Sequence, residues 1–137
     1  MGYIERRQFS GSVDASVVAL YSPHTATNTT EWAYKTLTSS YVNSISTGTV
    51  VYKEGYAGTL SSGTVQELSC NRTYSGQVIS NLLRCSYTSY GGDSGGIVYT
   101  MVGSSYVAVG ITVAKDSGGS YCCMAKYIIP ALGLTLY

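Results

Sequence analysis

Charged residues are scarce in this 137-residue sequence. Aspartate, glutamate, lysine and arginine together make up 11% of the chain, and the formal net charge is +1. No basic stripe exists, so a nucleic-acid or anionic-membrane partner has no electrostatic support. No apolar run approaches the roughly 20 residues that a helix needs to span a bilayer. We therefore expect neither nucleic acid nor a membrane as a partner.

Proline is almost missing too, and histidine occurs once. Two prolines against 16 glycines and 14 tyrosines, with many serine, threonine and valine residues, favour short strands joined by turns over helices. The four cysteines include no Cys-x-x-Cys pair, which disfavours a zinc site. We expect no metal and no other cofactor.

Turn residues and alternating apolar positions predict how the chain is organised. Residues 3–20 read as two strands joined by a turn, and a polar connector follows, in which Trp32 and Tyr34 are expected to anchor the chain to a barrel wall. The later segments read as six strands with short turns, which matches a closed antiparallel barrel. Pro130 suits the first turn of a short terminal helix that ends near Gly133.

One glycine-rich stretch, residues 91–96, places Ser94 between an acid and four glycines, directly before the apolar run Ile97–Tyr99. Glycines of this kind permit a tight loop with bare backbone amides. A serine presented on such a loop can act as a nucleophile, and the neighbouring N–H groups can face a developing oxyanion. The alternative is an ordinary glycine-rich β-turn. The segments on both sides of the motif, described next, disfavour that alternative.

The residues Gly92–Gly96 resemble the active-site serine loop of chymotrypsin-type (trypsin-like) serine proteases, Gly-Asp-Ser-Gly-Gly. Further segments are similar to the bacterial streptogrisin and α-lytic protease group: residues 12–20 to the strand of the triad aspartate, 51–55 with 62–65 to the start of the second barrel, and 131–134 to the terminal helix. The resemblance runs from about Gly11 to the end. It covers nearly all of the chain but not a whole enzyme.

This resemblance implies an all-β fold, the six-stranded antiparallel Greek-key second barrel of the chymotrypsin fold. Residues 1–21 would be remnant strands of the first barrel, 22–47 an interdomain connector, and 48–137 the second barrel with its short carboxyl-terminal helix. In that barrel the strand of Cys85 lies between those of the other cysteines. The four residues are Cys70, Cys85, Cys122 and Cys123. Two alternatives remain: a disulfide between Cys85 and one of the other three, or four buried free thiols.

The resemblance also implies roles for individual residues. Ser94 would be the nucleophile and Asp14 the carboxylate that orients the base, while the amides of Gly92 and Ser94 would form the oxyanion hole and Asp93 would support the loop. The specificity pocket would lie between two short segments: Thr88 and Ser89 on one side, and Val113, Ala114 and Lys115 on the other. With Thr88 at its base, the pocket favours small or medium uncharged side chains. Lys115 would favour acidic ones, but the alternative is a lysine at a loop edge that is only solvated.

Two features depart from the family pattern. The single histidine, His24, follows Asp14 and lies in the connector, so we expect the base to come from a missing amino-terminal part. The place where bacterial members carry an arginine partner for Asp93 is Tyr56, which predicts a buried acid without a counter-charge and a mobile or collapsed loop.

Function and location follow as expectations. No signal peptide is visible at the amino terminus, and we expect an extracellular protein, part of a longer secreted precursor. The leading hypothesis is a serine endopeptidase acting on polypeptides, with this chain alone inactive; the alternative is a non-catalytic protease-like binding or assembly module. Because two strands cannot close a barrel, residues 3–20 are expected to be disordered or paired with the same segment of a neighbouring molecule.

Overall fold

The computed structural model describes residues 2–136. Its strands are β1 (Gly2–Ser10), β2 (Val13–Leu20), β3 (Leu37–Tyr41), β4 (Val50–Gly55), β5 (Thr59–Tyr74), β6 (Gln77–Cys85), β7 (Ile97–Val102), β8 (Ser105–Asp116) and β9 (Gly119–Met124), and they are followed by the helix α1 (Ala125–Ala131).

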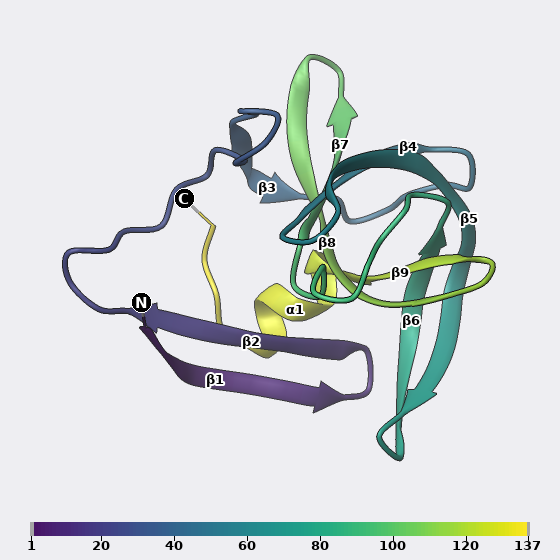
Figure 1. Cartoon of the computed structure of the whole chain (residues 1–137), viewed down its shortest axis with the longest axis horizontal. Coiled ribbons are helices and arrows are strands. Elements are labelled where there is room, and N and C mark those ends of the chain that lie inside the picture. The colour runs from purple at the N-terminus through teal and green to yellow at the C-terminus, as the bar shows by residue number, and fades with distance from the viewer. Residues whose placement is uncertain (1, 137) are drawn as a thin grey trace.

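The strands β4 to β9 close into a barrel. Their order is β8-β7-β4-β5-β6-β9, and an additional antiparallel pairing of β8 with β9 completes the ring (Figure 1). Alternate side chains of these strands fill the interior, among them the fully buried Val51, Leu83, Val98 and Val109. The predicted six-stranded antiparallel barrel is therefore confirmed, and β3 adds to it as a parallel neighbour of β8.

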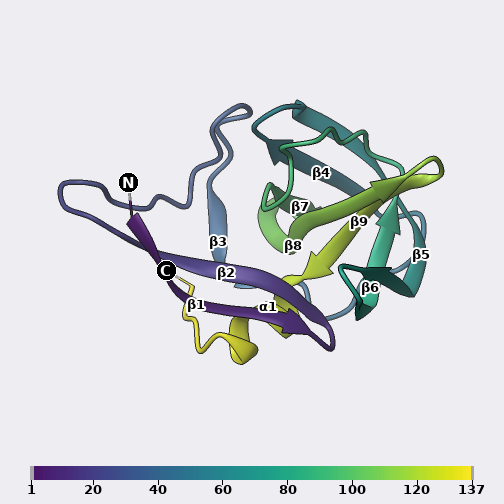
Figure 2. The same ribbon diagram turned by 60° about the horizontal axis from the view of Figure 1, so that its bottom comes forward.

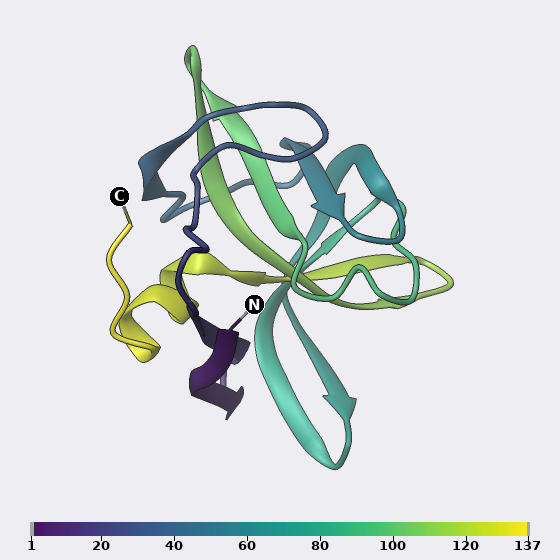
Figure 3. The same cartoon turned by 60° about the vertical axis from the view of Figure 1, so that its left-hand side comes forward.

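The β5–β6 hairpin projects from the barrel (Figure 3). Three register shifts between Val65 and Arg72 bend β5 as it leaves the ring. Ser75 and Gly76, both with positive φ, make the turn at the tip. The hairpin contributes Cys70, Ile79 and Leu82 to a second apolar cluster, which also includes residues of β2, β9 and α1.

The hairpin β1–β2 packs on that second cluster, beside α1 (Figure 2). Val13 is 3% exposed and joins Ile79, Cys123 and Leu132. At the hairpin turn, the Ser80 amide donates to the Gly11 carbonyl over 2.7 Å. The expected disorder of residues 3–20 is thus wrong: β6, β9 and α1 provide the apolar contacts that a hairpin lacks by itself.

The connector between β2 and β4 is anchored differently from the sequence-based expectation. Trp32 and Tyr34 are 45% and 80% exposed, so neither ring fixes the connector. The anchor is the buried carboxylate of Glu54, which accepts hydrogen bonds from the amides of Trp32 (2.8 Å) and Ala33 (3.3 Å). A hydroxyl from the barrel, that of Tyr99, donates to the same carboxylate over 2.7 Å.

The carboxyl-terminal helix α1 is short and packs against β2, β8 and β9. Pro130 lies in its last turn and not in its first. The helix ends shortly after, where Gly133 adopts φ 59°, as the sequence predicted. In residues 2–136, no helix is long and apolar enough to cross a membrane.

The four cysteines are buried free thiols. Their order across the sheet is as predicted, since β6 with Cys85 lies between β5 with Cys70 and β9 with Cys122 and Cys123. Burial raises the pKa of the Cys85 thiol to about 12. Within the described part of the chain, histidine, cysteine, aspartate and glutamate form no group of three or more that could hold a metal ion.

Candidate active site

The loop between β6 and β7 presents Ser94. It is fastened at both ends, because the Asp93 amide donates to the Tyr90 carbonyl (3.0 Å) and the Gly95 amide donates to the Thr112 carbonyl of β8 (2.8 Å). Gly92 has φ 103° and Gly95 has φ 86°, a region of backbone conformation that favours glycine. These glycines allow the chain to fold tightly around the serine.

Two backbone amides of this loop remain available to a ligand. Among residues 2–136, none accepts a hydrogen bond from the amide of Gly92 or of Ser94. The two amides flank Asp93 in sequence, and they are the pair assigned to an oxyanion hole by the resemblance. Free N–H groups beside a serine hydroxyl are what stabilisation of a tetrahedral oxyanion requires.

Asp93 supports the loop through a buried ion pair that the sequence analysis missed. Lys53 Nζ lies 2.7 Å from Asp93 Oδ2, and both side chains are fully buried. Amides of Gly58 (2.7 Å) and Tyr90 (2.9 Å) also donate to the carboxylate. Burial by itself would raise the pKa of Asp93, but these hydrogen bonds outweigh it and hold the pKa at about 2.

The expectation that Asp93 lacks a counter-charge is therefore wrong. Tyr56, the position considered for the missing partner, is 89% exposed. The alternation of side chains along β4 indicates where the counter-charge lies. Val51 and Lys53 are two residues apart, so both side chains point into the barrel. A lysine at an inward position of a buried strand requires an acid, and Asp93 is that acid.

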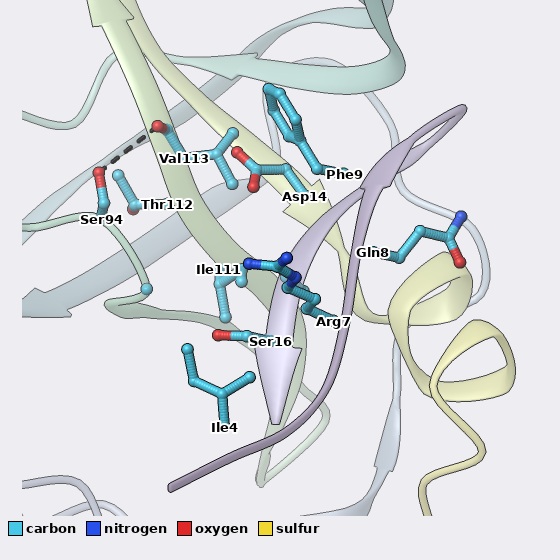
Figure 4. A pocket seen from close by; sticks show the side chains of 12 residues that line it. Ile4, Arg7, Gln8, Phe9, Asp14, Ser16, Ser94, Ile111, Thr112 and Val113 are labelled. Atoms are coloured by element: carbon cyan, nitrogen blue, oxygen red, sulfur yellow. Dashed lines mark hydrogen bonds between the residues drawn. The ribbon is translucent and has the colours of Figure 1, made fainter. Parts of the chain in front are cut away.

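Ser94 and Asp14 line the same cavity, although 80 positions separate them in the sequence (Figure 4). The cavity has a volume of about 480 Å³. Its walls are Ile4, Arg7, Gln8, Phe9, Asp14, Ala15 and Ser16 of the hairpin, and Ser94, Gly95, Ile111, Thr112 and Val113 of the barrel. The docking of the hairpin β1–β2 therefore places the predicted nucleophile and the predicted carboxylate in the same cavity.

Among residues 2–136, neither Ser94 nor Asp14 contacts a base. The Ser94 hydroxyl donates only a long hydrogen bond, 3.5 Å, to the Val113 carbonyl. The Asp14 carboxylate accepts a hydrogen bond from the Tyr74 hydroxyl at 2.5 Å. His24 is exposed in the connector and is not among the residues that line the cavity; Arg7 of β1 is the basic residue that does.

The residues predicted for a specificity pocket divide between two places. Thr88, Ser89 and Lys115 line a second cavity of about 330 Å³, whereas Val113 faces the Ser94 cavity and Ala114 packs on the second apolar cluster. Thr88 is exposed and does not form the base. Two buried serine hydroxyls of the lining belong to Ser89 and to Ser120, and the sequence analysis did not single out Ser120. The remaining wall residues are Ser86, Tyr87, Asp116, Ser117, Gly118 and Gly119.

The architecture is that of the bacterial chymotrypsin-like serine proteases, as the motif at residues 92–96 predicted. A protease from Nocardiopsis (NAPase) is 26% identical, with a TM-score of 0.82 over 98% of this chain and 73% of that one. Thermobifida fusca protease A is also 26% identical, with a TM-score of 0.75 over 91% of this chain and 68% of that one. Cellulomonas bogoriensis chymotrypsin shares the fold at 20% identity, with a TM-score of 0.81 over 99% of this chain and 75% of its own.

Comparisons at the level of sequence add nothing to this result, since no protein-family model and no curated protein matches the chain.

Proposed function

We propose that this chain is the part of a secreted serine endopeptidase that carries the nucleophile Ser94 and the orienting carboxylate Asp14. The general base is supplied by residues outside this sequence. One observation carries the proposal: Ser94 and Asp14 face one cavity, and the lining of that cavity includes no histidine. The scarcity of charge and the abundance of hydroxyl side chains support an extracellular location.

Each group then has a defined task in peptide hydrolysis. A base seated in the cavity takes the Ser94 proton as Oγ attacks the scissile carbonyl, and Asp14 orients that base. The amides of Gly92 and Ser94 stabilise the oxyanion, and the loss of one such donor costs about 3 kcal/mol. Without the base, Ser94 is a weak alcohol nucleophile, and catalysis by the oxyanion hole alone amounts to about 10³-fold over water. The isolated chain is accordingly inactive.

The alternative is a protease-like module that binds or assembles without catalysis. Two observations favour it. The Tyr74 hydroxyl already donates a hydrogen bond to the Asp14 carboxylate, and Arg7 lines the cavity where a base would bind. The hairpin also exposes Ile4, Val18 and Leu20, a face through which residues 3–20 would associate with a second copy.

The coding sequence upstream of Met1 separates the two hypotheses. A further ~60–80 codons that include a histidine in a first-barrel segment support the endopeptidase. An in-frame stop directly upstream supports the non-catalytic module.

A chemical test uses the chain itself, because the cavity has room for a free imidazole molecule as a substitute base. We expect no rapid labelling of Ser94 by a fluorophosphonate probe, and measurable labelling when imidazole is added in large excess. Ser94→Ala must abolish that labelling and Asp14→Asn must slow it. Rapid labelling without imidazole would contradict the proposal, and its loss in His24→Ala would then identify His24 as the base.

A further inference from the structure

The second cavity adjoins Ser94 through two shared segments. The loop that carries Thr88 and Ser89 continues to Ser94, and the strand that carries Lys115 continues to Val113, whose carbonyl accepts the Ser94 hydrogen bond. If the proposed function holds, a side chain seated in this cavity belongs to the residue whose carbonyl faces Ser94. What the cavity selects depends on the charges in its wall.

The one acid in that wall, Asp116, is already neutralised. Its carboxylate accepts hydrogen bonds from the Tyr121 hydroxyl and the Gly118 amide, both at 2.8 Å. Two guanidinium groups pair with it as well, Arg72 at 3.2 Å and Arg84 at 3.8 Å. With four donors around it, Asp116 offers no unpaired negative charge to a cationic ligand.

The one cation in the wall, Lys115, is unpaired. It forms no ion pair with any acid in the described part of the chain, and its ammonium lies 5.4 Å from the centre of the Tyr90 ring. That contact keeps Lys115 beside the serine loop.

A guanidinium lies behind the wall, but its charge is shared with Asp116 and Glu67, so Lys115 remains the unpaired cation of the cavity. Arg84 lies directly behind the wall residue Gly118, where an added Cβ would collide with its guanidinium, and the buried Nε of Arg84 has no hydrogen-bond partner among residues 2–136. The buried end of the cavity is neutral, since the Ser120 hydroxyl donates to the Tyr87 carbonyl and Ser89 bonds to Ser120.

We infer that this cavity accepts an acidic side chain, glutamate or aspartate, and that Lys115 is the residue that selects it. The inference rests on the proposed function for its meaning as a cleavage preference, but the binding itself does not require catalysis. Because Lys115 is exposed, the preference is moderate: an exposed ion pair changes affinity by up to about fivefold.

The test measures binding of acetylated tripeptides that end in glutamate, glutamine or lysine to the whole chain by NMR titration. We expect the glutamate peptide to bind more tightly than the glutamine peptide, by up to about fivefold. It should shift the amides of Ser89, Lys115 and Gly118, and its binding should weaken with added salt. Lys115→Gln should remove the preference, and Lys115→Arg should keep it. Lys115→Glu should reverse it in favour of lysine.

Equal binding of all three peptides, a preference that survives in Lys115→Gln, or no binding of any peptide would overturn the inference. Labelling of Ser94 reports separately on the proposed protease function. A glutamate preference without labelling in excess imidazole supports the acidic site and rejects the protease function. Imidazole-dependent labelling without the preference supports the protease function and rejects the acidic site.

Discussion

Lys53 and Asp93 form an ion pair with 2.7 Å between Nζ and Oδ2, and both side chains have no exposed surface. The pair joins an inward position of β4 to the residue directly before Ser94. It therefore holds the Gly92 and Ser94 amides in place before any ligand binds, which is the condition for electrostatic stabilisation of an oxyanion without reorganisation.

Removing Lys53 should destabilise the fold strongly. Lys53→Met leaves the Asp93 charge buried without its partner, and we expect a loss of about 3–5 kcal/mol in the free energy of unfolding, measured by urea denaturation. The double variant Lys53→Met/Asp93→Asn should recover part of that loss, because no buried charge remains. Lys115→Met, at an exposed lysine, is the control and should cost less than about 0.5 kcal/mol. A similar cost for both lysines would show that the pair does not stabilise the fold.

Acid should remove the contribution of Asp93 in a defined range. Its pKa in the folded protein is about 2, below the ordinary value of 3.8. The depressed pKa therefore stabilises the folded state above about pH 4, and this stabilisation, about 2 kcal/mol, is lost as the pH falls towards 2. The difference in unfolding free energy between the wild type and Asp93→Asn should narrow by that amount between pH 7 and pH 2. A constant difference would contradict the assignment.

Glu54 should control the order of the connector. Replacing it by glutamine puts an amide NH₂ where an oxygen now accepts from backbone donors, so at least one of the Trp32 and Ala33 amides loses its acceptor. We expect these amides to exchange with solvent faster in Glu54→Gln, with a cost of about 1–3 kcal/mol. Glu31→Gln, an exposed acid in the same connector, is the matched control and should change neither quantity. Unchanged exchange in Glu54→Gln would mean that other contacts fix the connector.

Two valines of β2 test whether the buried face of the hairpin β1–β2 holds it on the rest of the fold. Val13 is 3% exposed and Val18 is 48% exposed. Val13→Ala should cost about 2 kcal/mol and reduce hydrogen-exchange protection in β1 and β2 before it affects the barrel. Val18→Ala should cost about 0.5 kcal/mol or less. If both substitutions had the same effect, the hairpin would not be held by the buried face of β2.

Local chemistry along the chain was enough to predict several elements. Alternating apolar residues and turn glycines identify the barrel strands, because period-two burial is a property of each strand by itself. The spacing of glycines around Ser94 identifies the serine loop, because only certain residues tolerate its backbone angles. The same alternation indicates that Lys53 points inward with Val51, although the sequence alone does not reveal its partner.

Other features depend on contacts between distant segments, and only the tertiary structure decided them. The pairing of Lys53 with Asp93 arises because the loop between β6 and β7 closes over β4, and the cavity shared by Ser94 and Asp14 arises because the hairpin docks on β6, β9 and α1. The sequence of the connector did not predict that Glu54 anchors it. Glu54 accepts hydrogen bonds from backbone amides, and every residue except proline has such an amide. Local periodicity determines which way a side chain points, whereas the partner it meets depends on long-range packing.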